Sequence, residues 1–122
     1  MGGLVSVKNG FSVAQHFADR PETLRATYQA ILAAARKFGP VVEDPKKTSI
    51  HLNRRTAFAG IAPRRASLIM TVKSSSDIAS DRVRKRERAS ANRWHLEIEL
   101  STPAEVDREV RSWLKSAYAL AG

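Results

Sequence analysis

The chain of 122 residues contains no cysteine and only three histidines. The lack of cysteine excludes disulfide bonds, thiolate zinc sites, iron–sulfur clusters and cysteine nucleophiles. Three histidines leave little material for any other transition-metal site, so we expect no metal and no other cofactor. No glycine-rich phosphate loop and no Ser/His/Asp arrangement stands out, which favours a binding domain over an enzyme.

Long hydrophobic runs are also missing. No apolar stretch approaches the ~20 residues that a membrane helix needs. The first residues hold too few apolar side chains for a secretory signal. We therefore expect a cytoplasmic protein that does not associate with a membrane.

What the chain has is the composition of a globular protein, with 43% hydrophobic and 27% charged residues. Its length predicts a single domain. We expect a flexible or partly ordered segment over residues 1–18 and one domain over residues 19–122.

The positive charge is concentrated in the middle of the chain. The formal net charge is +9. Residues 46–93 contain thirteen basic and three acidic residues, a balance of +10, whereas the rest contains eight basic and nine acidic residues, a balance of −1. Such asymmetry bears on partners rather than on fold.

Two amphipathic helices flank this middle segment. The first is expected to begin near Pro21, with Asp19 and Glu22 as a capping box, and to stop at Gly39-Pro40. The second is expected to begin after Thr102, with Pro103 at its first position and Glu105 completing a capping box. Their apolar stripes recur at spacings of three and four. These stripes consist of Leu24, Tyr28, Ile31, Leu32, Ala35 and Phe38, and of Val106, Val110, Trp113, Ala117 and Leu120.

Between the helices the period of the pattern falls to two. Strands are expected over residues 48–53, 57–62, 67–73 and 93–100, with turns at 53–55 and 63–65. Residues 74–92 contain few large apolar side chains, and we expect a mobile basic loop or a short polar helix there. The resulting fold class is α+β: a two-layer sandwich with an antiparallel sheet of four to five strands and both helices on one face.

Several short segments are similar to those of one known family. They include His16-Phe17, Gly39-Pro40-Val41, Pro45-Lys46-Lys47-Thr48, Phe58-Ala59, Pro63-Arg64, the segment 92–98 around His95, and Trp113-Leu114. In this order the chain resembles a small bacterial family of unknown function, domain family 5655, from about His16 onward. The resemblance implies a small α/β domain and brings no activity, cofactor or catalytic residue.

The densest basic run is the first functional candidate. Phosphates attract clustered Lys and Arg because binding releases condensed counterions. This pattern favours nucleic acid, another polyanion or an acidic protein as partner, although a solvated, solubilising loop explains it as well. The run consists of Arg82, Arg84, Lys85, Arg86 and Arg88.

A second basic set lies at the predicted turns. If the turns cluster at one edge of the sheet, they present several cations to an anion. The alternative is that charged turns prevent sheets from pairing with each other. This set consists of Lys47, Arg54, Arg55, Arg64 and Arg65.

The third candidate is the polar face of the predicted sheet. His51, His95 and Glu97 fall on the wet side of their strands, where they could line a small-ligand or acid–base pocket. Self-association through this face or through an edge strand is a further alternative and would give a homodimer.

Overall fold

A computed structural model describes residues 10–122, and residues 1–9 of the expected N-terminal segment lie outside the described part. Four helical elements are present: α1 (Val13–Phe17), α2 (Glu22–Arg36), the 3₁₀ turn η1 (Pro103–Glu105) and α3 (Arg108–Leu120). The six strands are β1 (Val42–Pro45), β2 (Ile50–Asn53), β3 (Ala57–Pro63), β4 (Leu68–Ser74), β5 (Val83–Ser90) and β6 (Arg93–Leu100).

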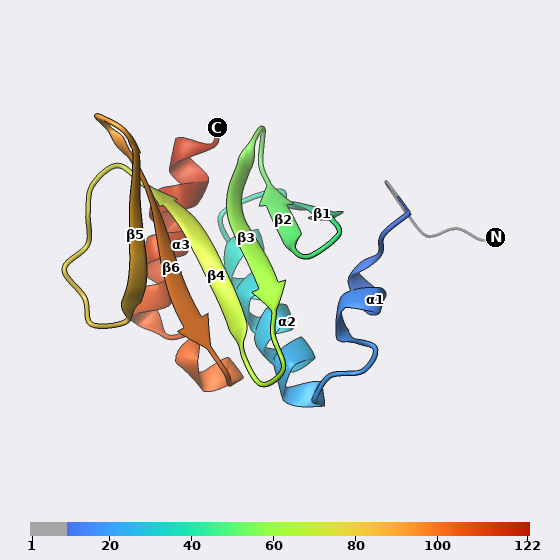
Figure 1. The fold of residues 1–122 in the computed structure, drawn as a ribbon. Helices are drawn as coiled ribbons and strands as arrows, with labels where there is room; N and C mark the ends of the chain where they lie inside the picture. Colours follow the sequence, from blue (N-terminus) through green and yellow to red (C-terminus); the bar gives the residue numbers. More distant parts are fainter. Residues whose placement is uncertain (1–9) are drawn as a thin grey trace.

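The strands form one antiparallel sheet in the order β1-β2-β3-β4-β6-β5. Helices α2 and α3 lie side by side against one face, and the other face is open (Figure 1). The expected α+β sandwich with both main helices on one face is therefore confirmed, but the strand count of four to five is wrong.

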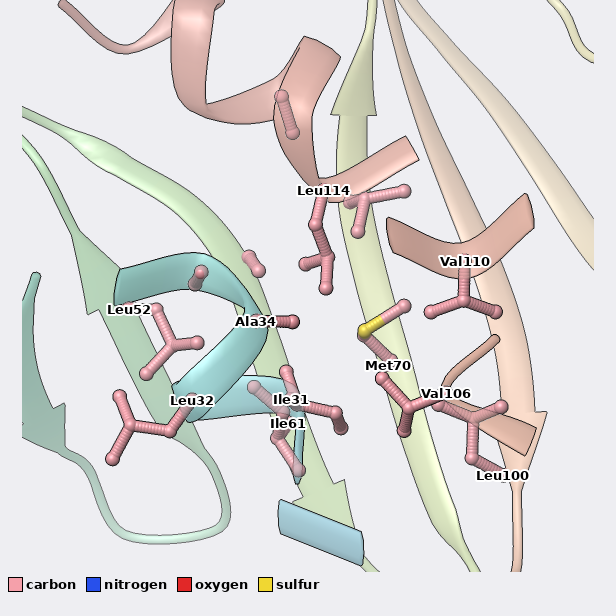
Figure 2. Close-up of a cluster of buried hydrophobic side chains, with 14 of the residues drawn as sticks. Ile31, Leu32, Ala34, Leu52, Ile61, Met70, Leu100, Val106, Val110 and Leu114 are labelled. Atoms are coloured by element: carbon pink, nitrogen blue, oxygen red, sulfur yellow. The ribbon is translucent and has the colours of Figure 1, made fainter. Parts of the chain in front are cut away.

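The core fills the space between the helices and the sheet. Ile31 of α2 and Leu114 of α3 reach Ile61 and Met70 of the two central strands, as Figure 2 shows. All four side chains are fully buried. Burying each large apolar side chain contributes about 1.5–3 kcal/mol relative to exposure, so this layer provides most of the stability of the sandwich.

Two strands were not expected. β5 lies in the segment for which we expected a loop or helix, because seven of its eight residues are exposed and only Val83 is buried. An edge strand that is exposed to solvent on both faces shows no alternation of apolar and polar residues, so its sequence does not indicate a strand. Instead it is held by antiparallel backbone pairing with β6, in which Lys85 lies opposite Glu97 and Glu87 opposite His95. β1 is four residues long, ends in proline and lies at the opposite edge.

The helix starts also differ from the prediction. At α2, Pro21 is the N-cap and no side chain caps the helix, so the Asp19 capping box is wrong. Thr102 and Glu105 do form the expected capping box, but it caps the 3₁₀ turn η1. The backbone of Val106 then leaves the helical region, and Asp107 caps α3 anew by accepting a hydrogen bond from the Val110 amide.

Candidate anion-binding site

The arginines of the run 82–88 are largely occupied by neighbouring groups. Arg82 Nη1 lies 2.9 Å from Asp107 Oδ1 and 3.2 Å from Glu109 Oε1, and Arg82 Nη2 donates to the Glu105 carbonyl at 2.8 Å. Burial opposes the charge of Arg82, but the hydrogen bonds that it donates to Asp107 and Glu109 outweigh burial and raise its pKa. Arg82 thus fastens β5 to the start of α3.

The rest of the run follows the same pattern. Arg86 donates to Asp77 at 2.7 Å, Arg84 lies 3.7 Å from Glu99, and the Arg88 guanidinium lies 5.7 Å from the centre of the Trp94 ring. Within the described residues, Lys85 is the one cation of the run without a side-chain hydrogen bond, ion pair or ring contact. Local acids therefore offset much of the charge of this run.

The second basic set does not gather at one edge. In the antiparallel order, the turn after β2 and the turn after β3 lie at opposite ends of the sheet. Arg54 and Arg55 precede β3, and Arg64 and Arg65 follow it, so the length of β3 separates the two pairs. Arg54 Nη1 donates to the Tyr118 carbonyl at 3.1 Å and its guanidinium stacks on the Tyr118 ring at 4.5 Å, so it holds the C-terminal end of α3.

The other end of the sheet forms a hollow of about 420 Å³, called here the end pocket. Its polar lining comes from three parts of the chain: the α1–α2 connection, the β1–β2 turn and the end of β3. The cations are Arg20, Lys47 and Arg64, and the remaining lining residues are His16, Thr48, Ala62 and Pro63. No acidic side chain lines this hollow within the described residues.

Backbone carbonyls hold Arg20 in place beside the other cations. Its Nε donates to the His16 carbonyl at 2.7 Å and its Nη1 donates to the Arg64 carbonyl at 3.3 Å. His16 is itself buried, and its Nε2 lies 2.8 Å from the Lys46 carbonyl. Because a carbonyl can only accept, His16 Nε2 carries the proton and ties α1 to the β1–β2 turn. His16 therefore has a packing role.

The remaining two cations have no anionic neighbour. Neither Lys47 nor Arg64 makes a side-chain hydrogen bond or ion pair within residues 10–122, and residues 1–9 contain no Asp or Glu. The nearby Asp44 carboxylate pairs with Lys46 at 3.0 Å. Three cations in one hollow repel each other, and an anion bound among them relieves that repulsion.

The open sheet face brings two of the three residues predicted there together. His51 and His95 line one depression of about 280 Å³, together with Gly60, Thr71 and Lys73. Glu97 lies in a neighbouring, smaller hollow with His95, Lys85 and Glu87. The His95 Nδ1 atom is 3.6 Å from Glu87 Oε1.

Two negative findings concern residues 10–122. No group of three or more His, Asp or Glu side chains in this range is placed to hold a metal ion. No helix in the same range is long and apolar enough to cross a membrane.

The sequence model of one known family covers nearly the whole of this fold. The family is described as Domain of unknown function (DUF5655), and the match spans residues 13–121. The chain belongs to the DUF5655 family. No curated protein and no solved structure matches it. The end pocket and the sheet-face depression both lie within the DUF5655 domain.

Sequence reasoning missed one of the three cations of the end pocket in this DUF5655 domain. Arg20 lies outside the basic middle segment, next to Asp19 and Glu22, so no local charge pattern distinguishes it. Only the tertiary fold carries it to the end of β3, 44 positions along the chain.

Proposed function

We propose that this DUF5655 domain binds phosphate-bearing polyanions, with nucleic acid as the leading class, through the end pocket. The observation that carries the proposal is that Arg20, Lys47 and Arg64 line one hollow without an acidic side chain. A guanidinium matches phosphate with two parallel hydrogen bonds, and an ammonium adds a point charge.

The arrangement favours the end pocket over the run 82–88 as the centre of binding. Releasing Arg82 or Arg86 to a phosphate would break ion pairs of 2.9 and 2.7 Å that hold β5 in place. Binding of a phosphate by Lys47 and Arg64 breaks no interaction of this kind, because neither side chain makes a hydrogen bond or ion pair within the described residues.

The test is a fluorescence anisotropy titration with labelled single- and double-stranded nucleic acid at low and physiological salt. We expect Arg64→Ala and Lys47→Ala each to lower the affinity about five- to tenfold, as expected for the loss of a charged phosphate contact. Two matched variants control for net charge. Arg65→Ala changes the neighbouring residue of the same turn, and Lys115→Ala changes an exposed lysine on the helical layer.

Both controls should stay within about twofold of the wild type, because neither side chain lines the end pocket and physiological salt screens exposed charges that do not contact the ligand. Equal losses in all four variants would mean that only net charge matters, and would contradict a defined site. The absence of binding at low salt would refute the function itself.

A small-ligand pocket on the sheet face is the second candidate. Its support is that His51 and His95 line one depression. The version with acid–base chemistry is weaker, because Glu97 faces the neighbouring hollow instead. Self-association through an edge strand stays a prediction, with β1 and β5 as the two edges and sedimentation as its test.

A further inference from the structure

The floor of the sheet-face depression is a glycine. Gly60 lies opposite His51 on β2 and opposite Thr71 on β4, so the row of side chains across the open face is interrupted there. A Cβ atom added at Gly60 would lie 3.6 Å from His51 Cδ2, in ordinary van der Waals contact. The missing side chain therefore opens a flat space beside the His51 ring.

The walls of this space suit a planar, uncharged ring. His51 and His95 are half-buried imidazoles, the Thr71 hydroxyl can donate or accept, and Lys73 supplies a cation. No carboxylate lines the depression within the described residues. Imidazole rings stack on nucleobases as other aromatic side chains do. The remaining lining residues are apolar, which favours stacking over ionic contact; they are Ala57, Phe58, Ala59 and Val72.

The depression and the end pocket both lie along strand β3. Ala62 lines the end pocket and Gly60 lines the depression, and both are on β3. Residues two apart on a strand point to the same face and are about 7 Å apart. One nucleotide can span this distance, with its phosphate among the cations and its base over Gly60.

We infer that the sheet-face depression is a nucleobase subsite, so that the ligand of the end pocket is a nucleotide unit, free or within a single strand. This inference rests on the proposed function. It also predicts a preference for single strands, because the bases of a duplex are stacked and paired and cannot lie on the sheet.

The experiment compares two labelled oligonucleotides of equal length, one normal and one composed of abasic sites. Both carry the same phosphates, so the proposed function requires both to bind. The base subsite adds about tenfold in affinity for the normal strand, the effect expected of one stacked base.

The variants Gly60→Val and His51→Ala test where the bases lie. Gly60→Val fills the space above Gly60 with a side chain that is favourable in a strand. His51→Ala removes the ring on which a base would stack. Each should reduce affinity for the normal strand to that for the abasic strand and leave abasic binding unchanged. Gly60→Ala, which adds one methyl group in ordinary contact, serves as the milder variant if Gly60→Val does not fold.

The outcomes separate the two proposals. If neither strand binds, the proposed function fails, and the base subsite fails with it. If both strands bind equally, the base subsite is refuted and the proposed function stands. If the normal strand binds more tightly but Gly60→Val and His51→Ala do not change this, the bases lie elsewhere and the inference is wrong. Titration followed by NMR should shift the ring signals of His51 and His95, which line the depression.

Discussion

Arg82 Nη1 lies 2.9 and 3.0 Å from the two carboxylate oxygens of Asp107, which joins the edge strand β5 to the N-terminus of α3. The two residues are 25 positions apart. The same carboxylate accepts a hydrogen bond from the Val110 amide, so a single side chain both caps α3 and holds β5. A residue that sequence reasoning assigned to a nucleic-acid patch therefore has a structural task.

The first prediction compares two arginines of the same run. Arg82→Ala should lower the free energy of unfolding by about 1–2 kcal/mol, because it leaves Asp107 and the Glu105 carbonyl without their partner. Arg84→Ala removes a pair separated by 3.7 Å, with both side chains about half exposed. Such a surface pair contributes about 0–1 kcal/mol. Urea denaturation measures both changes, and equal changes would contradict the structural role of Arg82.

The second prediction concerns pH. The Val110 amide, and then Arg82, lower the pKa of Asp107 below its usual 3.8. A carboxyl group with a lowered pKa in the folded state stabilises the protein above its unfolded pKa, and this contribution is lost as the pH falls through the folded pKa. Asp107→Asn keeps a capping side chain but removes the charge.

The melting temperature of Asp107→Asn should therefore lie below that of the wild type by a constant amount from pH 7 to about pH 5. The difference should then shrink as the pH falls below about 4. In an Arg82→Met background, Asp107→Asn should still lower the melting temperature, but by a smaller amount, since the Val110 amide remains as a partner of the carboxylate. If the difference in melting temperature grew on acidification, the pKa of Asp107 would be raised in the folded state rather than lowered, and the prediction would be wrong.

The third prediction concerns the salt dependence of binding. Each phosphate contact to a single strand contributes about 0.7 to the slope of log K against log salt concentration. The double variant Lys47→Ala/Arg64→Ala should reduce that slope by about 1.4 if both cations contact phosphates. The double variant Arg65→Ala/Lys115→Ala, with the same net charge, should leave the slope close to that of the wild type.

The fourth prediction contrasts two glycines. Gly39 has φ of +150°, and an added Cβ would overlap the Tyr118 hydroxyl. That hydroxyl donates to the Pro40 carbonyl at 3.0 Å and cannot move away without losing the bond. Gly39→Ala should lower the free energy of unfolding by about 1–3 kcal/mol through overpacking.

Gly60→Ala is the matched control for that variant. Its new methyl group would meet only the His51 ring at ordinary contact distance. We expect a change within about 0.5 kcal/mol, as for a surface substitution. A large loss at Gly60 would indicate that the sheet-face depression is needed for folding and would remove Gly60→Val as a binding probe.

The sequence by itself determined the elements that bury a continuous apolar stripe. The alternation in residues 93–100 and the three-to-four spacing from Leu24 to Phe38 correspond to β6 and α2, because hydrophobic burial imposes those periods. The two helices needed a common partner, and the one-sided sheet supplied it.

The tertiary structure alone decided the features that depend on long-range partners. β5 exists because β6 and Arg82 hold it, and neither contact has a local signature. The antiparallel order separated Arg54 from Arg64 and carried Arg20 to the end of β3. Charge is conspicuous in a sequence, but whether a cation is paired depends on which carboxylate the fold brings within hydrogen-bond distance. That is why the arginines of the densest basic run have partners nearby, while the end pocket draws one of its three cations from outside the basic segment.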